Sequence, residues 1–243
     1  MKRKALLIGN SNGLSGVKLD IRNFTMFLKQ DVGGQWYDSE IVIKMNPLKS
    51  DLIATISSLK SERNDFMFVV FSGHGAYQKG TVLEINGREE VINESDLKFI
   101  APRQVSVFDC CRNLVSMPIT ESLLEKSTRI FSSTTPIRAK YNTRIMQAIE
   151  QQVSLYACSV NESALDTETG GLYINNLLKA AGNIYSTEYK LVGIAHEEAK
   201  ETTKKEAWNK EKHNQNPTAT LPKCLSSQQL IISINPNSNN RYW

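Results

Sequence analysis

The 243-residue sequence contains only three histidines and four cysteines, and it has no long apolar run. A membrane-spanning helix needs about 18 or more consecutive apolar residues, which no stretch supplies. The basic start of the chain precedes a short apolar run that ends at Gly9 and Asn10, and a signal peptide needs a longer one. The sequence therefore predicts a cytoplasmic protein without membrane contact.

The scarcity of cysteine also argues against a metal centre. Cys110, Cys111, Cys158 and Cys224 show no CxxC spacing, so we expect no zinc site and no cofactor. In a reducing compartment each cysteine is by default a small buried hydrophobe. The formal net charge is +4, but the basic residues are dispersed along the chain, so no nucleic-acid partner is predicted.

What the chain does contain is an alternation of strand and helix patterns. Apolar residues make up 40% and charged residues 22% of the chain, which is typical of a globular protein. Strands are predicted at residues 4–10, 39–45, 66–71, 104–111, 152–159 and 228–234, and helices at residues 16–31, 49–62, 94–101 and 171–182. This alternation indicates an α/β fold with a mostly parallel sheet and helices on both faces.

Three further features complete the predicted organisation. Asn86 and Gly87 lie between two short strand patterns in residues 80–93, which predicts a β-hairpin. Residues 195–215 are polar and charged and indicate either a helix or a partly mobile segment. We expect one domain over residues 1–235 and a flexible tail over residues 236–243.

Two of the predicted strands end in residues that could carry chemistry. In "VVFSGHGAYQKG" a buried strand runs into His74, which has a glycine on each side, and in "FDCCRN" the next long strand ends in two cysteines. Parallel neighbouring strands end at the same edge of a sheet, where α/β proteins keep their sites. A histidine beside a cysteine is a base beside a nucleophile, so the sequence predicts a thiol nucleophile activated by an imidazole.

These stretches resemble the signatures of a known family. "FSGHGA" and "DCCRN" resemble the SGHG and D-x-C motifs of caspase-like cysteine peptidases, which include caspases, metacaspases, paracaspases and bacterial homologues. The first strand and helix, the hairpin after His74, and the segment "YACSVNESALDTETGGLYINNLLKA" are similar to that family as well. The resemblance extends over residues 4–235. It implies a three-layer sandwich, with a six-stranded sheet of strand order resembling 2-1-3-4-5-6 and a small β-hairpin after the histidine.

The resemblance also implies the catalytic residues. In the D-x-C register set by Asp109, Cys111 is the nucleophile and His74 the base; Cys110, on the opposite side of the strand, is the alternative nucleophile. The backbone N–H groups of Gly75 and Cys111 would form the oxyanion hole.

Acidic residues indicate the substrate. Asp20 and Asp109 match the acids with which metacaspases and paracaspases bind a P1 arginine or lysine, and Glu162 or Asp166 could add a third carboxylate. The resemblance thus implies an endopeptidase cleaving proteins after basic residues, with a separate regulatory protein and, by analogy with bacterial homologues, a role in stress, cell death or antiviral defence. Calcium dependence is known among metacaspases, and the scattered acids here do not decide it.

Two other functions are compatible with parts of the sequence. A catalytically silent caspase-like interaction module would share the fold, although such proteins usually lose a member of the catalytic pair. A nucleotide-binding α/β protein is suggested by "LIGNSNGLSG", but this stretch is neither GxGxxG nor a Walker A motif.

The connection over residues 112–151 has an excess of basic residues. They are Arg112, Lys126, Arg129, Arg138, Lys140 and Arg144. A peptidase specific for basic residues would find cleavage sites of its own there if the segment is exposed and extended, which Pro136 and the preceding Ser/Thr cluster favour. The alternative is that these charges solvate a surface or contact a partner.

Overall fold

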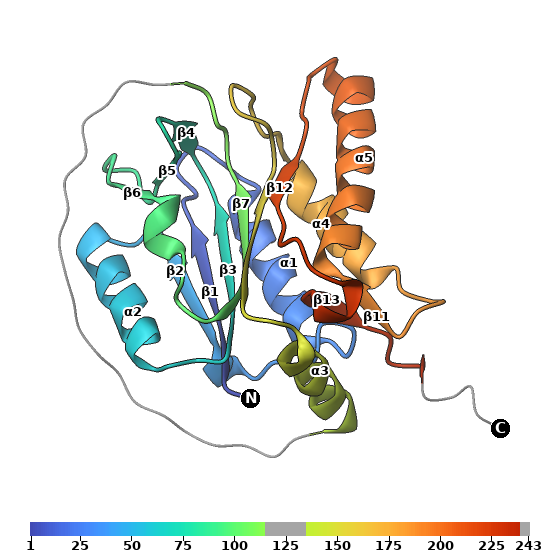
Figure 1. Ribbon diagram of the computed structural model, residues 1–243. Helices are drawn as coiled ribbons and strands as arrows, with labels where there is room; N and C mark the ends of the chain where they lie inside the picture. Colours follow the sequence, from blue (N-terminus) through green and yellow to red (C-terminus); the bar gives the residue numbers. More distant parts are fainter. Residues whose placement is uncertain (115–134, 239–243) are drawn as a thin grey trace.

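The computed structural model describes residues 1–114 and 135–238, and a six-stranded sheet forms its centre (Figure 1). The strand order is β2-β1-β3-β7-β8-β12, in which β12 alone runs antiparallel to its neighbour. The six strands are β1 (Arg3–Gly9), β2 (Ile41–Met45), β3 (Phe66–Ser72), β7 (Arg103–Asp109), β8 (Gln151–Tyr156) and β12 (Thr218–Thr220). The predicted strand order and the α/β class are confirmed.

The central strands are apolar on both sides because both faces of the sheet are covered. On one face, side chains such as Leu7, Phe68 and Val107 pack under helices; on the other, Ile8 and Val69 form a second core. The first face carries α1 (Val17–Lys29), α3 (Pro136–Gln147), α4 (Leu172–Gly182) and α5 (Val192–Glu211). The second carries α2 (Lys49–Ser61) and the sheet of β4 (Gly75–Tyr77), β5 (Thr81–Glu84) and β6 (Val91–Asn93).

The predicted hairpin at residues 80–93 is present and larger than expected. β5 and β6 pair antiparallel around Asn86 and Gly87, and β4 adds a third strand directly after His74. Three short single-turn helices occupy Asp38–Glu40, Glu94–Leu97 and Ser226–Gln228. The remaining strands form two small pairs, β9 (Asp166–Thr167) with β10 (Gly170–Gly171) and β11 (Tyr189–Leu191) with β13 (Ile231–Ile234).

The prediction that residues 228–234 form the last strand of the central sheet is wrong. Residues 231–234 form β13, which pairs with β11 apart from the main sheet. The sixth position belongs to β12, whose three residues are too short to show a periodicity of two. An apolar run such as "LIISI" predicts a buried strand, but it does not determine with which other strand that strand pairs.

The charged segment at residues 195–215 is helical over most of its length. Small side chains at Ala195, Ala199, Thr203 and Ala207 are buried and recur every four residues, which places one narrow stripe of α5 against α4. The charged residues point outward, and ion pairs such as Lys200 with Glu197 link neighbouring turns. Among the described residues, no helix combines the length and the apolar character needed to cross a membrane.

Residues 135–147 contradict the expectation of an extended, exposed connection. Pro136 stands at the first position of α3, where it favours a helix, and the hydroxyl of Thr135 accepts a hydrogen bond from the Arg138 backbone N–H. Arg138 and Arg144 are buried, as is Arg112, so these three arginines are not accessible cleavage sites in the folded chain. Lys126 and Arg129 lie outside the described residues.

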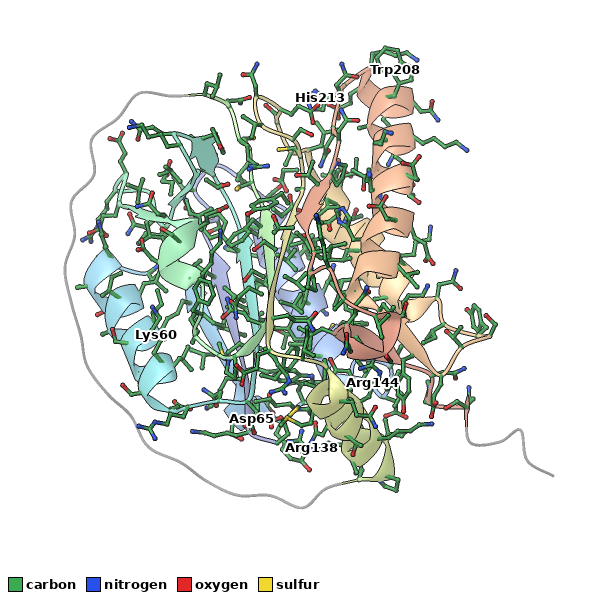
Figure 2. The ribbon with its side chains drawn as sticks, viewed as in Figure 1. Lys60, Asp65, Arg138, Arg144, Trp208 and His213 are labelled. Carbon is green, nitrogen blue, oxygen red and sulfur yellow. The ribbon has the colours of Figure 1, made fainter. Side chains whose placement is uncertain are left out.

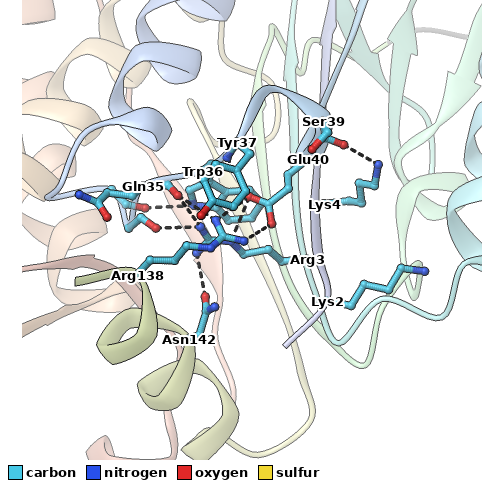
Figure 3. A network of polar contacts seen from close by, with 12 residues as sticks. Lys2, Arg3, Lys4, Gln35, Trp36, Tyr37, Ser39, Glu40, Arg138 and Asn142 are labelled. Carbon is cyan, nitrogen blue, oxygen red and sulfur yellow. Dashed lines mark hydrogen bonds and ion pairs between the residues drawn. The ribbon is translucent and has the colours of Figure 1, made fainter. Parts of the chain in front are cut away.

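Arg138 belongs to a buried ionic cluster at the amino end of the sheet (Figures 2 and 3). Its guanidinium binds both carboxylate oxygens of Glu40, at 2.8 and 2.5 Å, and Arg3 lies 3.5 Å from the same carboxylate. The Arg3 guanidinium stacks on Trp36, and the Arg138 guanidinium stacks on Tyr37. Burial alone would raise the pKa of Glu40, but Arg138 and Arg3 outweigh it and hold that pKa below its ordinary value. The cluster anchors α3 to the beginning of the chain.

Of the tail predicted at residues 236–243, the first part is folded. Residues 236–238 form a turn in which Asn235 accepts hydrogen bonds from the backbone of Asn237 and Ser238. Lys140 of α3 donates to the Ser238 hydroxyl. Residues 239–243 lie outside the described residues.

Replacing Glu40 should destabilise the fold far more than replacing its neighbour Asp38. Glu40→Gln leaves two buried arginines without a counter-charge, which costs about 3–5 kcal/mol. Asp38, in the same short helix, pairs with Lys29 but has an 87% exposed side chain, so Asp38→Asn should cost under about 1 kcal/mol. Denaturant unfolding followed by circular dichroism measures both; equal losses would contradict a structural role for the cluster.

Candidate active site

The two candidate catalytic residues lie at the ends of adjacent parallel strands. β3 and β7 pair over their full length, so that Ser72 lies opposite Asp109 at the carboxyl edge of the sheet. His74 follows β3 and Cys111 follows β7, and both line one cleft with about 340 Å³ of open space. Asp20, Asp109 and Asp166 line the same cleft. The fold therefore gathers a base, a thiol and three carboxylates from four separate segments.

The imidazole of His74 is oriented by a backbone carbonyl. Its Nε2 lies 2.6 Å from the carbonyl oxygen of Asn12, in the loop after β1. A carbonyl can only accept, so Nε2 carries the hydrogen and Nδ1 keeps its lone pair. The backbone of His74 is held too, because its carbonyl accepts from the Glu84 N–H of β5 at 3.1 Å. The ring thus has the tautomer in which Nδ1 can take a proton.

The cysteines near the strand ends differ in exposure. Cys110 is 2% exposed and packs into the second core, whereas Cys111 is partly exposed in the cleft. Burial raises the pKa of Cys110 well above its ordinary value, and burial raises that of Cys158 to about 12. Both buried sulfurs therefore remain protonated thiols. The Cys111 thiol makes one long contact, 3.9 Å to the Ala164 carbonyl oxygen.

Gly75 lies where the two strand ends come closest. A Cβ at this position would lie 2.7 Å from the Cys110 sulfur and 2.9 Å from the Cys111 carbonyl oxygen. Any side chain would push the His74 and Cys111 segments apart. The glycine after the histidine is therefore explained by the approach of the cysteine strand.

The carboxylates of Asp20 and Asp109 are buried and held by fixed donors. Asp20 accepts from the Ser72 hydroxyl at 2.6 Å and from the Gly171 N–H at 2.8 Å. Asp109 accepts from the Ile174 N–H at 3.0 Å, in the first turn of α4. The amino end of a helix favours negative charge, which is how the fold tolerates two carboxylates there.

Burial nevertheless disfavours ionisation of these acids. It raises the pKa of Asp20 to about 6, with a further contribution from the charge of Asp166. The pKa of Asp109 is raised well above its ordinary value by burial and then by Asp20. Asp166 accepts from the Gly16 N–H at 3.1 Å, at the start of α1. A cationic group entering the cleft would meet acids that gain from a counter-charge.

Glu162, the other candidate third acid, is not brought into this group. Its carboxylate accepts from the backbone N–H of Ser159 at 3.1 Å and from the backbone and side chain of Asn216. It thereby ties the loop after β8 to the segment after α5. This loop also supplies Ala164, Leu165 and Asp166 to the cleft, so Glu162 supports one wall without lining it.

Several residues that build the site carry no signal in the sequence. Asn12 and Ala164 act through backbone carbonyls, for which any residue type would serve. Ser72 could have been suspected, since it opens the "SGHG" stretch, but its partner Asp20 is 52 residues away. Among the described residues, no group of three or more His, Cys, Asp or Glu side chains is arranged to hold a metal ion.

Comparison with known proteins decides the family. A family model described as the caspase domain matches residues 2–224. The chain belongs to the caspase family. This confirms the resemblance carried by "FSGHGA" and "DCCRN" and supports a cysteine peptidase as the kind of protein.

Individual caspase-family relatives are distant. Metacaspase-1B of Aspergillus oryzae is 33% identical over 102 residues, which cover 37% of this chain and 23% of the fungal protein. The matched segment thus spans about a quarter of that relative.

Two solved structures show the fold. Caspase-1 from Spodoptera frugiperda has a TM-score of 0.58 at 12% identity, covering 90% of this chain and 87% of the insect chain. The protein GSU0716 from Geobacter sulfurreducens has a TM-score of 0.53 at 11% identity, covering 94% and 97% of the two chains.

The raised pKa of Asp20 predicts a pH-dependent stability in this caspase-family chain. The pKa of Asp20 in the folded chain, about 6, exceeds the ordinary value of 3.8. Protonated Asp20 therefore contributes fully to the free energy of unfolding below pH 3.8, and this contribution is lost as the pH rises through 6. One pKa unit corresponds to about 1.4 kcal/mol, so wild type should lose about 3 kcal/mol relative to Asp20→Asn between pH 4 and pH 8.

Unfolding midpoints over that pH range measure the difference. The matched control is Asp51→Asn, an exposed carboxylate on α2, which should follow wild type at every pH. If Asp20→Asn also follows wild type, the carboxylate of Asp20 is ionised without penalty in the folded chain.

Proposed function

We propose that this chain is a cysteine endopeptidase in which Cys111 is the nucleophile and His74 is the general base. The observation that carries the proposal is the cleft itself, where the oriented imidazole and the accessible thiol lie together with three aspartates. The family match supports the chemistry, and the position of each group supports the roles.

The proposed reaction begins with proton transfer from the Cys111 thiol to Nδ1 of His74. The thiolate then attacks the carbonyl carbon of the scissile bond, and the N–H groups of Gly75 and Cys111 stabilise the resulting oxyanion. The imidazolium returns its proton to the leaving amine, and water hydrolyses the thioester. The thiol contacts the Ala164 carbonyl oxygen only at 3.9 Å, so this contact does not prevent it from turning toward the base when substrate binds.

The carboxylates favour a basic P1 side chain. Asp20 and Asp109 are held by fixed donors on α4 and β3, and Asp166 adds a third carboxylate from β9. A guanidinium or ammonium would pair with these acids, whereas an acidic P1 residue would be repelled. We propose protein substrates cleaved after arginine or lysine, with a separate protein as regulator.

A catalytically silent module is the alternative, and the geometry favours the enzyme. A silent protein has no need for an imidazole held in one tautomer in the same cleft as an accessible thiol. Cys111 is accessible, while the other cysteines nearby, Cys110 and Cys158, are buried. The third possibility, a nucleotide site in residues 7–16, has less support, because this loop contributes its Asn12 carbonyl to His74.

Cys111→Ala and His74→Ala should each reduce peptide hydrolysis by roughly 10³-fold or more while leaving the fold intact. Cys110→Ala should keep most of the activity, since its sulfur faces the core. A thiol-reactive peptide with P1 arginine should label Cys111 stoichiometrically in a Cys224→Ser background, which removes the other partly exposed thiol.

Each assay is run with calcium and with a chelator, so that a calcium requirement is not mistaken for inactivity. Labelling at Cys110 in place of Cys111 would show that the nucleophile has been assigned to the wrong neighbour. A wild type that is neither labelled nor active under either condition would favour the silent module.

Hydrolysis should favour arginine or lysine over aspartate at P1, and Asp109→Asn should weaken this preference by about tenfold or more. The preference for arginine over citrulline, its neutral isostere, should fall as the pH drops below about 6, because Asp20 then becomes protonated. The ratio of kcat/KM for the two peptides cancels pH effects that both substrates share. Cleavage after aspartate at an equal or higher rate would refute the acidic pocket.

A further inference from the structure

Asn10 is a fully buried polar side chain that lies behind the cleft and is absent from its lining. It follows β1 directly, and its relative exposure is 0%. Its backbone N–H donates to the Ser72 carbonyl at 2.9 Å, which continues the pairing of β1 with β3. Its side-chain amide does not extend the sheet, so its contacts need a separate explanation.

The side-chain amide of Asn10 joins two segments that hold His74. Its Oδ1 accepts from the Asn12 N–H at 3.2 Å, within the loop whose Asn12 carbonyl binds Nε2 of His74. Its Nδ2 donates to the Glu84 backbone carbonyl at 2.9 Å and to the Glu84 carboxylate at 3.2 Å. Glu84, in turn, donates its N–H to the His74 carbonyl. One amide therefore fixes both the group that orients the imidazole and the strand that holds its backbone.

The surroundings explain why this position needs an amide. Alanine would leave the Asn12 N–H and the Glu84 carbonyl, which take part in part-buried hydrogen bonds, without their side-chain partner. Aspartate would place a negative charge against the Glu84 carboxylate and carbonyl. The approach is also close, since a Cβ on Gly73 would lie 2.8 Å from the Cβ of Asn10. Gly73 also has a φ of +155°. Both the close approach of Asn10 and this backbone conformation therefore favour glycine before His74.

We propose that Asn10 is a positioning residue for His74: it places the Asn12 carbonyl so that the imidazole stays in the Nε2–H tautomer and Nδ1 is left to accept a proton. The proposal rests on the proposed peptidase function, because a tautomer matters only where the ring transfers protons. Asn10 touches neither substrate nor the reacting atoms, and it acts through Asn12 and Glu84.

The first test is kinetic, with the full chain and an arginine-P1 peptide. Asn10→Ala should lower kcat by about tenfold to a hundredfold, since a small displacement of a catalytic group has effects of that size. KM should change by less than about twofold, because the acids of the cleft are untouched. The matched control is Asn64→Ala. Asn64 lies just before β3, at the opposite edge of the sheet; it is 1% exposed, and its side-chain amide donates to the Leu59 carbonyl. This variant should leave kcat unchanged.

The second test reads the tautomer directly. The chain has three histidines, so the imidazole ¹⁵N signals of His74 are assigned with His196→Gln and His213→Gln variants. In the neutral imidazole, wild type should show a protonated Nε2 and an unprotonated Nδ1, and Asn10→Ala should show a mixture of the two tautomers. If Asn10→Ala does not fold, Asn10→Ser replaces it. Its shorter hydroxyl reaches only one of the two segments, so the same direction of change is expected.

The outcomes separate the inference from the proposed function. An Asn10 variant with wild-type kcat, or with the wild-type tautomer at His74, would overturn the positioning role. A wild type without peptidase activity would refute the proposed function, while the ¹⁵N measurement would still decide whether Asn10 orients His74. If Asn64→Ala lowers kcat by the same factor as Asn10→Ala, the loss reflects stability alone and the positioning role is refuted.

Discussion

The parallel pairing of β3 with β7 is the constraint on which the rest of the site depends. Its register sets Ser72 opposite Asp109, so the segments that follow carry His74 and Cys111 out of the same sheet edge. The two segments touch at Gly75, where a Cβ would meet the Cys110 sulfur and the Cys111 carbonyl oxygen. Both strands are fully buried, so a slip of one residue would exchange the sides of every core residue on them. The two hydrophobic cores thereby maintain the geometry of the proposed dyad.

The buried acids of the cleft have an electrostatic cost, because burial disfavours their ionised form. Burial raises the pKa of Asp20 and of Asp109, with a further contribution from Asp166 to the first and from Asp20 to the second. Each carboxylate nevertheless keeps hydrogen bonds from β3 or from the start of α4. Such a pocket is least stable when it is empty and ionised, and it gains most from a cation. The raised pKa of these carboxylates and the proposed preference for basic residues therefore have one physical cause. At the amino end of the sheet, Glu40 shows the opposite case, since two arginines already satisfy its charge and lower its pKa.

The segments around the site are held by residues whose supporting role the sequence does not indicate. Asn10 links the loop after β1 to β5, and Glu162 links the loop after β8 to the segment after α5. Each is a polar group that satisfies backbone donors or acceptors in a loop with no regular pairing of its own. Such residues tie the loops at the carboxyl edge of the sheet to other segments of the chain.

The local sequence pattern alone determined the buried strands, most helices, the hairpin after His74 and the identity of the motifs. Burial and turn formation depend on residue types that lie close together in the sequence. The resemblance of "FSGHGA" and "DCCRN" was likewise visible without coordinates, and it named Asp20, Asp109, Glu162 and Asp166 as candidates for one pocket. Only the tertiary structure decided that Asp166 enters the cleft while Glu162 does not, and that β12 and not β13 completes the sheet. It also showed α3 as a helix in which Arg138 is buried, and the partner that favours its burial, Glu40, lies about a hundred residues away. Contacts between distant segments, and those made by backbone carbonyls such as that of Asn12, depend on the fold and not on residue type, so no local pattern reveals them.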